Sequence, residues 1–190
     1  MKTLAENVLK SDLLSVSRAL SFVENRKDGY LDLLDDLYKR GKPTKVIGVT
    51  GAPGVGKSTL VDVYIKELVS RKKKVAVIAV DPSSPFSGGA LLGDRIRMQS
   101  NYDNVFIRSV ATRGAVGGVS DCVFNMVVVF RAAGYEYIII ETVGVGQNEI
   151  SISKLSDLTL LVMNPGSGDD IQMMKAGIME TGDLFIINKS

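Results

Sequence analysis

Six short aliphatic runs follow one another from residue 45 onward, and they constrain the fold more than any other feature of the sequence. They lack a clean alternation of polar and apolar residues, which is typical of strands buried on both faces of a parallel sheet. The runs are Val46–Val49, Val75–Val80, Val105–Ile107, Tyr137–Ile140, Leu158–Met163 and Leu184–Ile187. Helix-compatible stretches separate several of them, so the sequence predicts an α/β fold with a mostly parallel central sheet and helices on both faces.

Helices are expected between these runs and ahead of them. Those between the runs are predicted at 57–70, 119–133 and 170–180. Ahead of the runs, residues 4–24 predict a continuous helix with one apolar stripe, and residues 30–39 predict a second helix. The stripe consists of Leu9, Leu13, Val16, Leu20 and Val23. We therefore expect an N-terminal helical extension, residues 1–44, and a main domain, residues 45–190.

The composition narrows the chemistry that is available. The chain has 190 residues, of which 45% are hydrophobic, and this is enough for a sizeable core. There is no histidine and a single cysteine, Cys122, so imidazole catalysis, histidine metal sites and an internal disulfide are excluded. A net charge of +2 gives no support to a nucleic-acid-binding face. The apolar runs are too short to span a membrane and the N-terminus is charged, so we expect a cytoplasmic protein.

The segment after the first aliphatic run matches the phosphate-binding pattern G-x-x-x-x-G-K-[ST] and predicts a P-loop NTPase fold. It reads Gly51, Ala52, Pro53, Gly54, Val55, Gly56, Lys57, Ser58 and Thr59. Glycines let backbone N–H groups approach a phosphate, and the helix that follows adds its free amides. We expect Lys57 to contact the outer phosphates and the Ser58 hydroxyl to bind Mg²⁺. In the empty loop, Lys57 is expected to be exposed.

Carboxylates that end other predicted strands are candidates for binding the metal and positioning the attacking water. Glu141 ends the fourth run and Asp81 follows the second. Since the carboxyl ends of parallel strands meet at one edge of a sheet, both should face the phosphate loop. Asp94 lies beyond a loop rich in Gly, Ser and Pro that could carry it to the site, and Gly144 could present its amide to a γ-phosphate. The alternatives are a solvated strand end for Glu141 and an Asp-Pro turn for Asp81.

Two further segments carry weaker signals. Asn188 and Lys189 follow the last run and resemble the start of N-K-x-D, the guanine-reading motif of GTPases. The aspartate of that motif would be the residue after Ser190. The segment 113–118 joins an arginine to three glycines and could fold over a nucleotide, although a plain loop is the simpler interpretation.

In this order, the segments resemble the MeaB/ArgK family of P-loop GTPases, in the SIMIBI class. The most specific parts are GAPGVGKST, VDPSSPFSGGALLGDRIRM and YIIIETVGVGQNE. The resemblance implies GTP binding and hydrolysis by a regulatory metallochaperone, which gates cofactor loading and protects an adenosylcobalamin-dependent methylmalonyl-CoA mutase. It implies GTP/GDP and Mg²⁺ as ligands, methylmalonyl-CoA mutase as partner, and a homodimer for the full-length protein.

The resemblance also assigns roles to residues. It implies that Lys57 contacts the phosphates and that Ser58 binds Mg²⁺. Three acidic residues would lie around the metal and the attacking water, namely Asp81, Asp94 and Glu141. Residues 144–149 correspond to a γ-phosphate-sensing switch. Residues 164–175 correspond to a further switch that communicates with the mutase.

Two other interpretations stay open. A nucleotide-dependent kinase or ATPase linked to amino-acid transport would use the same site with another phosphate acceptor. An inactive truncated fragment would keep the fold without the activity. The resemblance leads us to expect that the chain is incomplete at its C-terminus, since the family's base-reading aspartate and dimerising helices would follow Ser190. The choice of GTP over ATP then rests on the resemblance and on Asn188 and Lys189.

Overall fold

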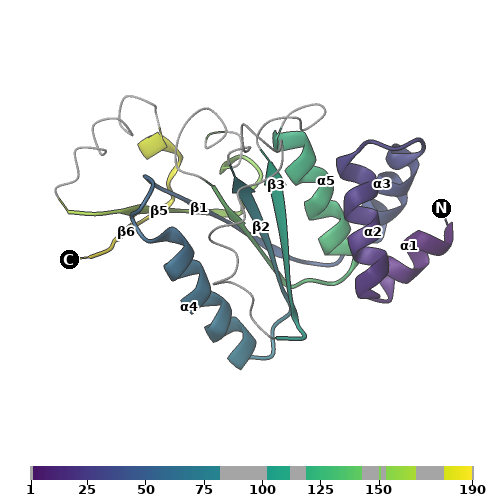
Figure 1. Cartoon of the computed structure of the whole chain (residues 1–190), viewed down its shortest axis with the longest axis horizontal. Coiled ribbons are helices and arrows are strands. Elements are labelled where there is room, and N and C mark those ends of the chain that lie inside the picture. The colour runs from purple at the N-terminus through teal and green to yellow at the C-terminus, as the bar shows by residue number, and fades with distance from the viewer. Residues whose placement is uncertain are drawn as a thin grey trace.

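The computed structural model describes residues 2–81, 102–111, 119–142, 150, 153–165 and 178–189, and only the backbone of Asp81. Six strands lie within these ranges: β1 (Lys45–Thr50), β2 (Val75–Asp81), β3 (Val105–Ala111), β4 (Tyr137–Glu141), β5 (Leu158–Met163) and β6 (Leu184–Ile187). They form one parallel sheet in the order β3-β2-β4-β1-β5-β6 (Figure 1). All six predicted strands and the α/β fold class are confirmed.

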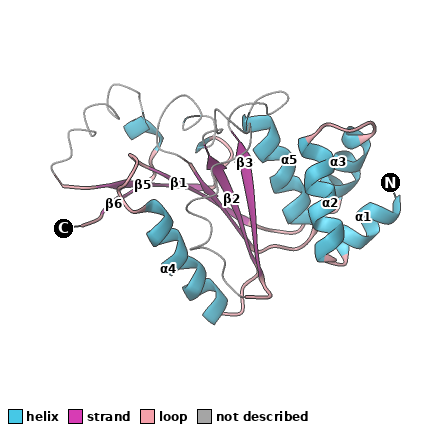
Figure 2. Ribbon diagram, viewed as in Figure 1, coloured by secondary structure: helices cyan, strands magenta, loops and turns pink. Residues whose placement is uncertain are grey.

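Helices cover both faces of this sheet, as predicted (Figure 2). The helices in the described residues are α1 (Lys2–Leu9), α2 (Leu13–Glu24), α3 (Tyr30–Lys39), α4 (Lys57–Ser70), α5 (Val119–Ala132) and a short 3₁₀ helix (Ile178–Thr181). Helix α4 packs on one face and α5 on the other, with α1–α3 on the outer side of α5. In the helix predicted for 170–180, residues 170–177 lie outside the described residues. No helix in the described part of the chain is long and apolar enough to cross a membrane.

The prediction of one continuous helix over residues 4–24 is wrong, because the structure has a break between α1 and α2. Ser11 adopts a φ of 65°, which a helix does not accommodate. Asp12 then caps α2, since its Oδ2 accepts a hydrogen bond of 2.8 Å from the backbone N–H of Ser15. Leu13 belonged to the predicted apolar stripe, yet the new helix start leaves it 52% exposed.

The hydrophobic core consists of two clusters, one on each face of the sheet. One joins α4 to the sheet through residues such as Val61 and Ile65. The other joins the opposite face to α5 and continues through it to α1–α3, with Leu20 and Phe130 among its fully buried members. The N-terminal helices thus share a core with α5, and the proposed division into residues 1–44 and 45–190 stays a prediction.

Burial on both faces describes the central strands but is wrong for β6. Residues Val75–Val80 of β2 are all buried, whereas in β6 Leu184 is 50% exposed and Ile187 is 66% exposed. Strand β6 is the edge of the described sheet and pairs only with β5 there. Its side chains therefore have fewer neighbours than those of a central strand.

The single cysteine provides a test of this packing. Cys122 is buried on α5, and burial, together with nearby Glu24, raises the pKa of its thiol to about 11. At pH 8 only about one thiol in a thousand would then be ionised. We expect native protein to react with a disulfide reagent such as DTNB far more slowly than urea-unfolded protein, with Cys122→Ser as the blank. Rapid stoichiometric labelling of folded protein would contradict the buried placement.

Candidate functional site

The candidate site lies where β1 and β4 end side by side. The register pairs Val49 of β1 with Glu141 of β4, and the backbone N–H of Thr142 donates to the Val49 carbonyl at 3.1 Å. The phosphate loop, residues 51–56, leaves β1 at this point and leads directly into α4. The structure therefore brings the Glu141 strand end to the loop, as the parallel topology predicts.

Glycines at Gly51, Gly54 and Gly56 give the loop its path. Their φ angles are +141°, +76° and +99°, all in the region that favours glycine. Gly51 also packs tightly, because a Cβ there would lie 2.1 Å from the carbonyl oxygen of Val162 in β5. The first turn of α4 begins after Gly56 with no side-chain cap, so no side chain competes with an anion for those amides.

The expectation that Lys57 is exposed is wrong, since only 7% of this residue is accessible. Its Nζ donates hydrogen bonds to the carbonyl oxygens of Gly51, at 2.8 Å, and Ala52, at 2.9 Å. The ammonium group thus bonds to carbonyl oxygens of the loop itself. The positive charge is held inside the loop rather than in solvent.

Ser58 and Glu141 form the closest contact of the site. The Ser58 hydroxyl donates to Oε1 of Glu141 at 2.5 Å, and Glu141 is only 8% exposed. Hydroxyl and carboxylate oxygens are the hard ligands that Mg²⁺ prefers, and they lie at the start of the helix that would receive the phosphates. These residues therefore fit a magnesium–phosphate group.

The structure describes some of the other predicted site residues only by their backbone, and others not at all. The backbone of Asp81 ends β2 and pairs with Ala111, on the strand β3 at the edge of the sheet. Asp94 and Gly144 lie outside the described residues, as do most residues of the two predicted switches. Within the described ranges, no group of three or more acidic, cysteine or histidine residues could hold a metal.

The segment after β6 is tied directly to the phosphate loop. Asn188 donates from Nδ2 to the carbonyl of Val55 at 2.8 Å, and Lys189 donates from Nζ to the carbonyl of Gly54 at 2.7 Å. The backbone N–H of Asn188 also bonds to Met163 at the end of β5. Both residues were predicted as nucleotide contacts, whereas these bonds to the loop were missed. The resemblance to N-K-x-D was the only signal for them.

One polar residue near the candidate site, Asn164, was not predicted individually as a site residue. Asn164 directly follows β5, and its Oδ1 is buried and has no hydrogen-bond partner among the described residues. Its type and position gave no distinct signal, because the Pro/Gly segment after it reads as an ordinary turn.

Comparison with known protein families gives matches over nearly the whole chain. The family model described as "Methylmalonyl Co-A mutase-associated GTPase MeaB" matches residues 16–190. A putative GTPase of Pyrococcus abyssi is 47% identical over 189 residues, covering 98% of this chain and 58% of that protein. The GTPase ArgK of Escherichia coli is 40% identical over 196 residues, covering 98% and 59%. The mitochondrial methylmalonic aciduria type A homolog of Caenorhabditis briggsae is 37% identical over 206 residues, covering 100% and 50%.

Solved structures agree with the fold. A crystal structure of an LAO/AO transport system kinase superposes with a TM-score of 0.74 at 29% identity, covering 97% of this chain and 54% of that one. The signal recognition particle receptor FtsY of Elizabethkingia anophelis, at 18% identity and a TM-score of 0.53, shares the fold alone. The chain spans between half and three fifths of the length of the curated relatives described above. Because the family model matches almost the whole chain, the chain belongs to the MeaB family of P-loop GTPases.

Proposed function

We propose that the protein binds GTP with Mg²⁺ and hydrolyses the γ-phosphate. The observation that carries this proposal is the contact between Ser58 and Glu141, which joins the first turn of α4 to the end of β4 beside the phosphate loop. Two oxygen ligands at the N-terminus of an uncapped helix suit a metal-bound polyphosphate. The names of the relatives, which are GTPases, agree with it.

Each residue of the site has a proposed task. Lys57 exchanges its bonds with the carbonyls of Gly51 and Ala52 for phosphate oxygens and neutralises their charge. Ser58 and Glu141 would hold Mg²⁺, which supplies further charge neutralisation when bound. Catalysis then consists of positioning and electrostatics, with no covalent enzyme intermediate.

Residues whose side chains the structure does not describe complete the proposal. Asp81 and Asp94 are proposed to act on the metal and the attacking water, and the Gly144 amide on the γ-phosphate. The family membership supports these roles. In-line attack needs an oriented water, and a carboxylate within hydrogen-bond reach can orient it.

We propose a preference for guanine on the basis of Asn188 and Lys189, which follow β6. Asn188 and Lys189 bond to the phosphate loop, so the segment that would read the base is anchored next to the segment that would hold the phosphates. A base reader needs this fixed distance from the phosphate site in order to discriminate between nucleotides. The GTPase relatives agree with this assignment.

The biological role that we propose is that of a regulatory chaperone for methylmalonyl-CoA mutase. The family description and the name of the Caenorhabditis briggsae relative support it. On this proposal the full-length protein acts in the cytoplasm as a homodimer, gates adenosylcobalamin loading and protects the mutase from inactivation. GTP turnover should be slow alone and faster with mutase.

Calorimetric titration with GTP and ATP tests the nucleotide proposal, and phosphate release with and without an adenosylcobalamin-dependent mutase tests the chaperone proposal. We expect GTP-selective, Mg²⁺-dependent binding and a turnover that rises when mutase is added. Equal affinity for ATP would overturn the guanine assignment. A turnover that does not change with mutase would overturn the proposed partner.

A second candidate function is phosphoryl transfer to a protein acceptor, and the similarity to the LAO/AO transport system kinase favours it. Both functions would use the same nucleotide site and differ in the group that receives the γ-phosphate. With γ-labelled GTP, hydrolysis delivers label to inorganic phosphate alone. Label on a protein acceptor would favour the kinase.

Replacing the carboxylate of Glu141 by an amide tests the proposed metal site. Glu141→Gln keeps the size of the side chain but removes the charge beside Ser58. We expect the Mg²⁺ concentration for half-maximal hydrolysis to rise about tenfold or more, as for other losses of a metal-site ligand or its support. Glu136→Gln is the matched control, because Glu136 pairs with Lys73 rather than lying at the site. An unchanged Mg²⁺ requirement in Glu141→Gln would contradict the proposed ligand.

A further inference from the structure

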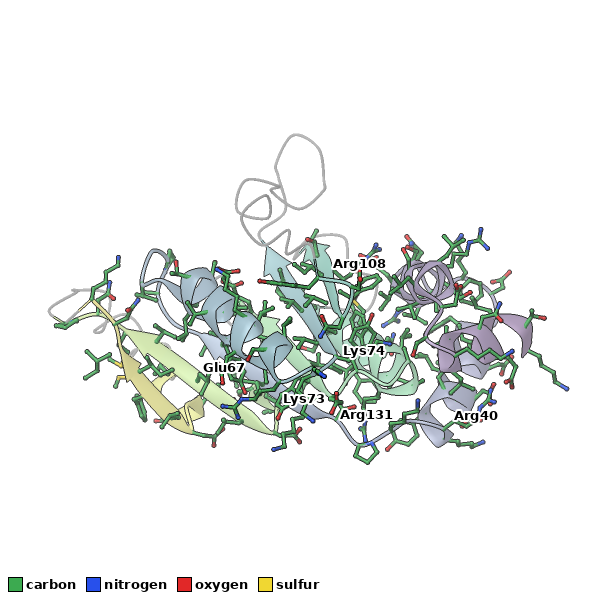
Figure 3. All side chains as sticks on the ribbon, turned by 90° about the horizontal axis from the view of Figure 1, so that it is seen from below. Arg40, Glu67, Lys73, Lys74, Arg108 and Arg131 are labelled. Atoms are coloured by element: carbon green, nitrogen blue, oxygen red, sulfur yellow. The ribbon has the colours of Figure 1, made fainter. Side chains whose placement is uncertain are left out.

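A second group of charges lies at the other end of the strands from the candidate site, where the strands begin and α5 ends. The backbone N–H of Lys45 donates to the carbonyl of Glu136, and the N–H of Lys42 donates to the carbonyl of Arg131. These bonds hold the segment before β1 against the segment between α5 and β4. Figure 3, which views the molecule from below, labels Lys74 and Arg131 between α4 and the N-terminal helices.

Several basic residues in this region have acidic partners within the protein. Lys73 pairs with Glu136 at 2.8 Å, and Arg71 pairs with Glu67 at 2.6 Å. Arg40 pairs with both Glu6 and Asp36. Neutralised pairs of this kind are the ordinary state of surface charges and point to no ligand.

Other cations of this region form no ion pair with a carboxylate in the described part of the chain. Among them are Lys42, Lys74 and Arg131. Lys74 donates to the carbonyl of Ala133 at 3.1 Å, and a Cβ on Gly134 would lie 3.0 Å from the Lys42 Nζ. The two ammonium groups thus lie against consecutive residues at the end of α5.

The proximity of these like charges is unfavourable. Burial, followed by the nearby Lys42, lowers the pKa of Lys74. The Ala133 carbonyl and the face of Tyr135, 4.4 Å from the Lys74 Nζ, account for the position of Lys74. Neither of these contacts involves Arg131, and neither supplies a negative charge to the group. An anionic ligand would supply one.

A pocket next to these cations supplies an apolar wall. Its volume is about 240 Å³, and it is lined by Tyr38, Gly41, Val128 and Arg131. Tyr38 is 62% exposed, and its ring is available to a ligand. Arg131 belongs to both the pocket and the group of unpaired cations, so a ligand could use the two features together.

We propose that the pocket lined by Tyr38, Gly41, Val128 and Arg131, together with the nearby cations Lys42 and Lys74, binds an acidic segment of a partner protein. The carboxylates of that segment would lie at the cations, and a neighbouring apolar side chain would lie against the exposed ring of Tyr38. Charge complementarity favours an acidic ligand. Three cations beside an aromatic wall suit a short peptide better than a nucleic acid, which needs a longer row of phosphate contacts.

The test uses a fluorescein-labelled peptide with four glutamates around one leucine, and a matched peptide with four glutamines. Fluorescence anisotropy should show saturable binding of the glutamate peptide only, weakening as salt rises. Replacing both exposed cations, in Lys42→Glu/Arg131→Glu, should weaken binding at least about tenfold, because hydrogen bonds to charged groups are lost. Lys27→Glu is the control, as Lys27 is exposed in the α2–α3 connection, where Arg26 pairs with Asp121 at the other end of α5.

The outcomes separate the proposal from its rivals. Loss of binding in the double variant, with Lys27→Glu within twofold of the original chain, supports it. Equal binding of the glutamine peptide, or equal losses in both variants, would overturn it. A single-stranded RNA oligonucleotide that displaces the peptide and binds more tightly would also overturn it. Nucleotide affinity is measured for each variant, and its retention shows that the fold is intact.

Discussion

Replacing Lys57 by alanine is expected to weaken GTP binding by at least about 100-fold. Charge-assisted hydrogen bonds contribute about 1.5–3 kcal/mol each, and Lys57 is proposed to make them to phosphate. Its Nζ lies inside the loop and donates to the carbonyls of Gly51 and Ala52. The variant therefore loses a charge that is positioned before the ligand arrives.

The same substitution should leave the protein folded. The two bonds that Lys57 makes to the loop contribute about 1.5–3 kcal/mol each at most. Their loss is offset in part because alanine removes the cost of burying an ammonium group, and both hydrophobic clusters remain. Calorimetry measures the binding and urea unfolding measures the stability. Lys66→Ala is the matched control on α4, because Lys66 pairs with Asp62 on the exposed side of the helix. Retained GTP affinity in Lys57→Ala would refute the phosphate-loop assignment.

Substituting Gly51 should have the largest effect on folding. In Gly51→Ala the new Cβ would lie 2.1 Å from the carbonyl oxygen of Val162, at a φ of +141° that other residues rarely adopt. The obstacle is the backbone of the neighbouring strand β5, so it cannot be relieved by a change of rotamer. We expect a loss of about 3 kcal/mol or more in the free energy of unfolding, or no folded protein.

Gly54→Ala separates the effect of the clash with Val162 from the effect of the positive φ. Gly54 also has a positive φ, of +76°, but a Cβ there would meet nothing within 4 Å. We expect it to lose only about 1–2 kcal/mol, the usual cost of this backbone conformation. Urea unfolding of the two variants gives the comparison. Equal stabilities would show that Val162 has room to move.

The strands were predictable because their signal is local. A run such as Tyr137–Ile140 has no other plausible place than a buried strand, and β4 contains it. The break near Ser11 escaped the same reasoning, since Leu9 and Leu13 keep helical spacing across it. Asp12 is a residue type that favours the position just before a helix, but the apolar stripe that continues across it favoured one unbroken helix.

The site was predictable in its residue types but not in its contacts. The pattern around Lys57 identifies a phosphate loop, yet the direction of that side chain depends on which carbonyls the folded loop offers. Likewise, Asn188 lies 133 residues from Val55, and only the order of strands in the sheet brings them together. Such contacts are set by tertiary structure and leave no local trace in the sequence.

The packing of α2 and α3 on α5 has a consequence for synthesis of the protein. Their apolar faces meet α5 and are fully buried, as at Leu20, Leu33 and Leu37. A ribosome that has finished α3 must add about 90 further residues before α5 is complete. At the usual rates of translation, the nascent chain would carry those helices without their partner for roughly 5–20 s. Helices α2 and α3 thus wait for a partner that is made much later than they are, and holding chaperones have that interval in which to act on them.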